Sequence, residues 1–141
     1  MKRFLTIFLL AFPLSLPAAE MNYDNLYNVR LVSDAFQARC FAQDEDGFIW
    51  IGTNKGLCCY DGYSVRAHYR PGSPDNVSVH SIALYGGDRL FLGTETGLMS
   101  YDIRRGSYGS PDSDAGRIVR SLMLDGEKLW MGTTDGLYVY D

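Results

Sequence analysis

Three cysteines and two histidines are the residues of this chain best suited to nucleophilic or metal chemistry. A catalytic thiol needs a nearby histidine and a group that orients it, and neither His68 nor His80 lies in such a motif. Cys58 and Cys59 are adjacent, so on a strand their side chains point to opposite faces. An exported protein could hold one disulfide and one free thiol, but spacing leaves the pairing of Cys40, Cys58 and Cys59 open. We therefore predict no catalytic residue.

The acidic run Asp44–Gly47 resembles part of a calcium loop. An EF-hand needs acidic ligands at its first and last loop positions, where this chain has Ala42 and Thr53. The run is therefore predicted to be a solvated hairpin turn, and neither a metal nor a cofactor is expected. Glycoside hydrolysis would need two carboxylates roughly 5–10 Å apart, and the sequence offers acids only in predicted turns.

The composition is that of a small globular protein. The chain has 141 residues, of which 46% are hydrophobic, 13% aromatic and 21% charged, which suits one packed domain. Fifteen glycines and ten tyrosines favour tight turns and β-strands. The net charge of −4 argues against nucleic-acid binding, because phosphate contacts need clustered cations.

The N-terminal residues are typical of a secretory signal peptide. Met1-Lys2-Arg3 is a short cationic start, Phe4 to Leu16 is an apolar run, and small residues follow it. The apolar run is too short to cross a bilayer of about 30 Å as a helix. We predict that residues 1–19 are cleaved and that the remainder is exported and soluble.

The strongest signal is an internal repeat. Gly52, Gly93 and Gly132 mark three copies spaced 41 and 39 residues apart, a period typical of β-propeller blades. The shared pattern is aromatic, aliphatic, Gly-Thr, two polar residues, Gly-Leu, two variable residues and Tyr-Asp. The repeat residues, all expected to be structural, are Trp50, Gly52, Thr53, Gly56, Tyr60 and Asp61; Phe91, Gly93, Thr94, Gly97, Tyr101 and Asp102; and Trp130, Gly132, Thr133, Gly136, Tyr140 and Asp141.

Each repeat position has a predicted role. The threonine hydroxyls could bond across turns, the first glycines would allow close packing of blades, and Gly56 is free to take a positive φ. Trp50, Phe91 and Trp130 are expected in the core between blades, in preference to a role as sugar-stacking platforms.

The predicted fold is all-β, with antiparallel four-stranded propeller blades. Asp46-Gly47 and Asp61-Gly62 are hairpin signals between strand-like stretches of the first copy. The fourth strand of the second copy, near Ser107-Tyr108, is weak, and the third copy lacks one, so we expect an incomplete ring. The predicted divisions are a lead-in at 20–37 with a candidate ring-closing strand, blades at 38–77 and 78–116, and a partial blade at 117–141.

The stretch Gly47 to Tyr63 resembles the two-component regulator propeller repeat, and residues 68–77 are similar to that family's link between blades. This repeat builds the periplasmic sensor region of hybrid two-component systems, common in Bacteroides-type bacteria. The resemblance implies a receptor with two propellers, an immunoglobulin-like domain, one membrane span, a histidine kinase, a receiver and a DNA-binding regulator. Such receptors sense oligosaccharides and switch on polysaccharide-utilisation genes, with kinase activity in domains that this chain does not contain.

Positions that differ between the copies are the candidates for ligand contact. The turn after the second strand and the link between blades are expected at one rim, where convergent polar groups suit a hydroxyl-rich or anionic sugar. Simple solvation of loop residues is the alternative. The candidate ligand-binding residues are Asn54, Lys55, Arg70, Asp75, Asn76, Glu95, Arg104, Arg105 and Asp135.

The sequence thus predicts the N-terminal part of a periplasmic, non-enzymatic ligand sensor. The expected partners are an oligosaccharide and either further propeller blades or copies of this chain. Two alternatives stay open, namely a fragment of a propeller-based carbohydrate-active enzyme and a truncated gene product without a function of its own. An open ring would leave sheet edges exposed, so the second alternative predicts aggregation.

Overall fold

The computed structural model describes residues 34–69, 77–110 and 116–141. The predicted signal peptide and the candidate ring-closing strand lie outside these residues, as do the candidate ligand residues Arg70, Asp75 and Asn76. All described residues belong to one compact unit. Every regular element within them is a β-strand.

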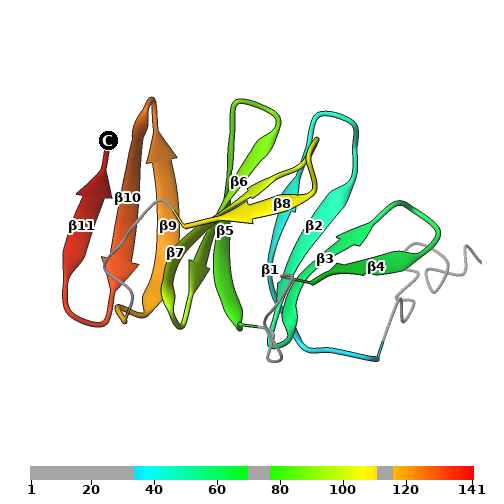
Figure 1. Cartoon of the computed structure of the whole chain (residues 1–141), viewed down its shortest axis with the longest axis horizontal. Helices are drawn as coiled ribbons and strands as arrows, with labels where there is room; N and C mark the ends of the chain where they lie inside the picture. Colours follow the sequence, from blue (N-terminus) through cyan, green and yellow to red (C-terminus); the bar gives the residue numbers. More distant parts are fainter. Residues whose placement is uncertain (1–33, 70–76, 111–115) are drawn as a thin grey trace, which may run out of the picture. The chain divides into compact units, whose positions relative to one another are not determined.

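The strands form three antiparallel sheets, one for each repeat (Figure 1). The first sheet has the order β1 (Ala38–Gln43), β2 (Ile49–Thr53), β3 (Gly56–Tyr60), β4 (Val65–His68). The second has the order β5 (Val79–Tyr85), β6 (Arg89–Thr94), β7 (Gly97–Asp102), β8 (Ser107–Gly109). The third has the order β9 (Val119–Asp125), β10 (Lys128–Thr133), β11 (Leu137–Tyr140). The all-β prediction is confirmed, and β8 is as short as its sequence indicated.

The Gly-Thr-x-x-Gly-Leu motif forms the tight turn between the second and third strands of each sheet. In the first sheet the Thr53 hydroxyl donates to the Gly56 carbonyl at 2.8 Å and accepts from the Lys55 amide at 3.0 Å. Gly56 has a φ of +109°, a backbone angle that residues other than glycine rarely adopt. The hydroxyls of Thr94 and Thr133 donate in the same way to the carbonyls of the corresponding glycines.

The first glycine of the motif permits a close approach of three elements. A Cβ atom at Gly52 would lie 2.3 Å from the Cys40 Sγ of the same sheet and 2.8 Å from Val79 of the next. A Cβ atom at Gly93 would lie 2.5 Å from the Ser81 Oγ and 2.9 Å from Val119. Because real Cβ atoms do not approach this closely, each glycine lets a first-strand side chain and the neighbouring sheet pack against the second strand.

The aspartate that ends the repeat holds the next turn. Asp61 Oδ1 accepts from the amides of Tyr63 and Ser64 at 2.9 and 2.7 Å. Asp102 Oδ1 similarly accepts from the Arg105 amide at 2.8 Å. Side-chain acceptance of this kind replaces backbone pairing in short turns, so the Tyr-Asp element fixes the hairpin between the third and fourth strands.

Two apolar clusters join the sheets. One buries Trp50 and Leu57 of the first sheet against Leu90, Leu92 and Tyr101 of the second. The other packs the opposite face of the second sheet against the third, with Phe91, Leu98, Val119, Leu129 and Met131. Trp50 and Phe91 therefore lie in the cores between sheets, whereas Trp130 is half-buried and belongs to neither cluster.

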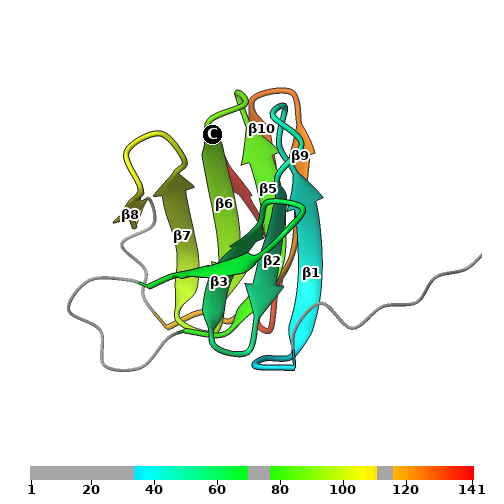
Figure 2. The same ribbon diagram turned by 90° about the vertical axis from the view of Figure 1, so that its right-hand side faces the viewer.

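The first strands of the three sheets are neighbours. β1 lies against β5, and β5 lies against β9, while the later strands spread away from this edge. Figure 2 shows β1 and β9 on one side and β7 and β8 on the other. This is the arrangement of adjacent propeller blades, with the first strands innermost.

Candidate ligand-binding site

The structure brings four of the predicted ligand residues to one end of the sheets. Asn54 and Lys55 lie in the β2–β3 turn, Glu95 in the β6–β7 turn and Asp135 in the β10–β11 turn. These three turns lie at the lower end in Figure 1. The rim therefore exists as a structural feature for these four residues.

Local hydrogen bonds already occupy much of the polar capacity of this rim. Asn54 Oδ1 accepts from the Gln37 amide at 2.9 Å, and Lys55 Nζ donates to the Ala35 carbonyl at 3.2 Å. Asp135 Oδ2 lies 3.5 Å from the Nε of Arg117. These contacts join the turns to the segments that precede β1 and β9. The side chains therefore have a structural role at the rim.

Arg104 and Arg105 lie at the opposite end of the second sheet, and the structure does not bring them to the predicted rim. They occupy the β7–β8 turn, one strand length away from Glu95 in an antiparallel sheet. Arg104 pairs with Asp88 at 3.6 Å and Arg105 with Asp102 at 3.9 Å. The sequence prediction failed here because successive hairpins of a blade alternate between its two ends.

A cleft that the sequence did not reveal lies between the first sheet and the β7–β8 turn. Its volume is about 400 Å³, and Phe48 leaves 40% of its surface exposed there. Asp61 and Arg66 bring opposite charges 3.5 Å apart beside it. The lining residues are Phe48, Trp50, Cys59, Asp61, Arg66, His68 and Ile103.

A buried polar and aromatic network forms the wall of this cleft. The Trp50 indole N–H donates to Asp44 Oδ2 at 2.8 Å. His68 Nδ1 lies 2.7 Å from the Tyr101 hydroxyl, and the Tyr108 hydroxyl donates to the His68 carbonyl. The Trp50 ring centroid is 5.0 Å from that of His68 and 5.4 Å from that of Tyr101. The network links both sheets and holds the cleft wall in one arrangement.

The predicted hairpin turn at Asp44–Gly47 is present, with Glu45, Asp46 and Gly47 exposed, but Asp44 itself is not solvated. Its side chain is only 8% exposed and accepts from the amides of Asp46 and Phe48 as well as from the indole. The carboxylate is thus an internal acceptor that shapes the β1–β2 turn. The sequence signal for it is an aspartate before the hairpin and a tryptophan six positions later, on the strand that follows.

Burial and backbone hydrogen bonds shift the pKa values of the groups around the cleft. Burial, with a smaller effect of the Arg66 charge, holds the pKa of His68 below its usual value of 6.5. Backbone amides of Ser64 and Tyr63 lower the pKa of Asp61. Burial raises the pKa of Cys59 to about 11. At neutral pH the cleft therefore presents a neutral imidazole, a carboxylate and a guanidinium.

The remaining thiols are also protonated. Cys40, Cys58 and Cys59 are all unpaired, and burial raises the pKa of Cys40 to about 11 and that of Cys58 above its usual value. The thiolate is the reactive form of cysteine. These side chains therefore pack as small apolar groups in the ground state.

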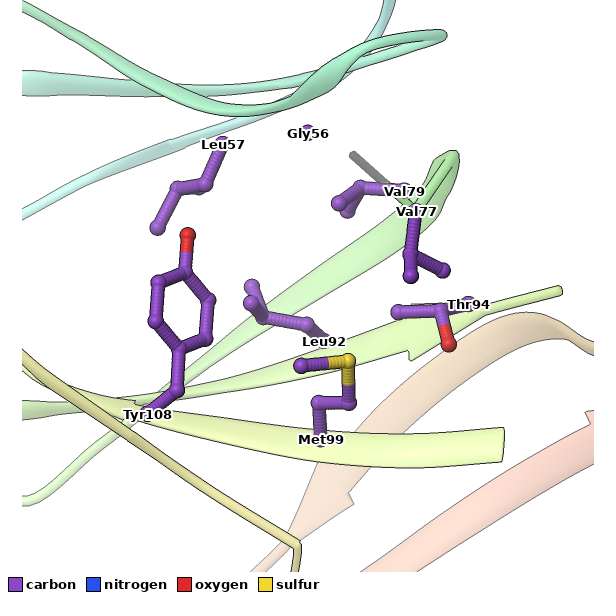
Figure 3. A pocket seen from close by; sticks show the side chains of 8 residues that line it. All are labelled: Gly56, Leu57, Val77, Val79, Leu92, Thr94, Met99 and Tyr108. Carbon is purple, nitrogen blue, oxygen red and sulfur yellow. The ribbon is translucent and has the colours of Figure 1, made fainter. Parts of the chain in front are cut away.

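Of two other cavities, one is too small for a saccharide and the other lies on the first sheet. The space between the first two sheets shown in Figure 3 holds about 20 Å³, room for roughly one water, and its walls are mostly apolar, among them Leu57, Leu92 and Met99. A cleft of about 360 Å³ on the first sheet includes Lys55 and otherwise mainly apolar side chains. Within the described ranges, no three metal-ligating side chains gather, and no helix is long and apolar enough to span a membrane.

Comparison with known proteins identifies the repeat and the fold. Residues 31–55 match the family model described as two component regulator propeller. The extracellular domain of the hybrid two component system BT4673 from B. thetaiotaomicron is 38% identical, with a TM-score of 0.70. The alignment covers 81% of this chain and 15% of that chain. This chain therefore spans a small part of the length of that domain.

More distant structures share the fold alone. The extracellular domain of BT3049 from the same organism is 19% identical, with a TM-score of 0.55, over 74% of this chain and 18% of that one. PorZ of Porphyromonas gingivalis, a surface component of the type-IX secretion system, is 22% identical with a TM-score of 0.55, over 73% of this chain and 17% of that one. No curated protein matches the sequence.

Proposed function

Because the chain carries the two component regulator propeller repeat, we propose that it is part of a periplasmic ligand-sensing propeller that recognises oligosaccharides. The observation that carries this proposal is the 38% identity, over 81% of the chain, to the extracellular domain of a hybrid two component system. The expected output of such a receptor is regulation of polysaccharide-utilisation genes. The proposed location is the periplasm, reached through cleavage of residues 1–19.

The cleft of the first sheet supports a saccharide as the ligand. Sugars are bound by aromatic rings that stack on their apolar faces and by polar groups that fix their hydroxyls. Phe48 supplies an exposed ring, and the largely exposed guanidinium of Arg66 supplies hydrogen-bond donors beside it. The buried network behind Trp50 holds this wall without requiring the ligand.

The proposed activity is binding without turnover, and the proposed partners are further propeller blades or copies of this chain. Large exposed apolar side chains on both flanking sheets support association. Phe41 on the first sheet is 64% exposed, and Met123 and Leu137 on the third are 59% and 69% exposed. Large exposed apolar side chains of this kind mark surfaces that are covered in an assembly.

Calorimetry of the purified chain against a panel of neutral and acidic oligosaccharides tests the proposal. At least one saccharide should bind, and Phe48→Ala should weaken binding about tenfold or more, since an aromatic contact contributes on the order of 1 kcal/mol beyond its buried area. Phe41→Ala removes a phenylalanine that is 64% exposed and lies outside the cleft, and it should leave the affinity for the saccharide unchanged.

Two outcomes would count against the proposal. If no saccharide binds, the ligand class is wrong. If chromatography after prolonged incubation shows shortened oligosaccharides, the chain is an enzyme and not a simple binder.

A further inference from the structure

The first strand of each sheet carries an irregularity at the same place. In β1 the pairing with β2 shifts between Ala38 and Cys40, so Arg39 has no opposite residue. In β5 the shift between Val79 and Ser81 leaves out His80. In β9 the pairing moves from Val119 to Ser121 and leaves out Arg120. The inserted residue of each β-bulge is thus an arginine or a histidine.

The repeat itself accounts for the position of these bulges. The residue after each bulge is opposite the crowded glycine of the Gly-Thr pair, as Cys40 is opposite Gly52. A Cβ atom on Gly132 would lie 2.3 Å from the Ser121 Oγ, which shows the same close approach in the third sheet. A β-bulge changes the direction of the inserted side chain, and bulges are frequent at sheet edges and beside functional sites.

The three bulges follow one another across the sheets. β1, β5 and β9 are the edge strands of their sheets and lie side by side, with β5 between the other two (Figure 1). Arg39 and Arg120 are exposed, and His80 is half-buried between them. The inner edge of the described sheets therefore carries a row of Arg39, His80 and Arg120.

The charges of both arginines act on His80. Burial lowers the pKa of His80, and the charges of Arg120 and Arg39 lower it further, while Glu95 of the β6–β7 turn opposes them. Among the described residues no carboxylate forms an ion pair with Arg39 or Arg120. Arg66, Arg104, Arg105 and Arg117, by contrast, each pair with an aspartate. The row thus concentrates unneutralised positive charge in a chain whose net charge is −4.

We propose that Arg39, His80 and Arg120 form one anion-binding row that takes the carboxylate or sulfate groups of an acidic saccharide. This proposal specifies the charge of the ligand, and it rests on the proposed function for the assumption that the ligand is a saccharide. Guanidinium groups bind carboxylates and sulfates through paired, charge-assisted hydrogen bonds. Equivalent positions on successive sheets suit a ligand whose charges repeat along a chain.

Matched pairs of charged and neutral probes test the row. Oligogalacturonate is compared with its methyl ester, and dextran sulfate with dextran, by calorimetry of the full chain at one fixed salt concentration. The wild-type chain should bind at least one acidic probe about tenfold or more tightly than its neutral partner, as charge-assisted bonds imply. The two pairs separate a carboxylate from a sulfate preference.

Two variants of equal charge assign the effect to the row. Arg39→Gln with Arg120→Gln should abolish the preference for the acidic probe. Arg89→Gln with Lys128→Gln removes two exposed cations from equivalent positions at the starts of β6 and β10, and it should retain the preference. Circular dichroism and thermal unfolding establish that both variants fold.

The outcomes separate this inference from the proposed function. Equal affinity for acidic and neutral probes overturns the row and leaves a saccharide sensor in place. An equal loss in both variants overturns it too, because the effect is then one of net charge. If acidic probes fail to bind, the row is wrong, and if neutral ones fail as well, the proposed function fails with it.

Discussion

The threonine hydroxyl of each repeat stabilises a turn through hydrogen bonds to two backbone groups. Thr94 is fully buried, donates to the Gly97 carbonyl and accepts from the Thr96 amide, so its loss leaves two backbone groups without a partner. Thr94→Val should therefore lower the free energy of unfolding by about 1–3 kcal/mol. Thr94→Ser keeps the hydroxyl and should recover most of the loss in urea denaturation. Thr133→Val should cost less, because the equivalent bond is exposed, and equal costs would contradict this account.

The histidines give the molecule two opposite responses to acid. The pKa values of His68 and His80 lie below 6.5 in the folded protein, so below about pH 6.5 the unfolded chain binds more protons. The free energy of unfolding should fall as the pH drops through that range. Binding of an acidic probe at the row should strengthen over the same range, because protonation adds a cation at His80.

His80→Gln separates these effects. The variant should lose the pH dependence of oligogalacturonate affinity between about pH 8 and pH 5, measured by calorimetry, and retain part of the acid loss of stability through His68. A wild-type affinity that does not change with pH would remove His80 from the row.

At the scale of the strand, crowding at the first glycine sets how sheets can meet. Gly52→Ala places a methyl group against Cys40 and Val79 and should destabilise the chain by about 1–3 kcal/mol, as overpacking does. Cys40→Ala in the same chain relieves one of these two contacts, so the double variant should be more stable than additivity predicts. Thermal unfolding of the four proteins measures the coupling, and strict additivity would show that Cys40 is not the obstacle.

The same elements show what a sequence can and cannot predict. The turn glycines and threonines were predictable because a turn is local and its geometry depends on a few adjacent residues. The buried state of Asp44 depends on Trp50 approaching it from the next strand. The bulges at Arg39, His80 and Arg120 arise where the next residue faces a crowded glycine of the second strand, and this contact between strands is not visible in the sequence of the first strand alone. The cleft needs two sheets to exist at all.

At the scale of the three sheets, burial is uneven. The second sheet contributes to both apolar clusters, whereas the third contributes to one, and β11 is mostly exposed or half-buried. Local opening is easiest where few apolar contacts would be lost. Amide hydrogen exchange should therefore be slowest in β6 and β7 and fastest in β11 among the strands. Uniform protection across the three sheets would show that they open as one unit.

The buried indole of Trp50 has an optical consequence. It lies on the cleft wall against His68, while the second tryptophan, Trp130, lies in the third sheet. A Trp130→Phe chain would carry a single tryptophan, beside the cleft. Its emission, excited apart from that of the tyrosines, responds to the polarity around the indole and to the charge of the adjacent imidazole. A ligand that enters the cleft should change this emission, and one that binds at the row of Arg39, His80 and Arg120 should leave it unchanged. The chain thus contains its own unlabelled reporter for telling its two candidate surfaces apart.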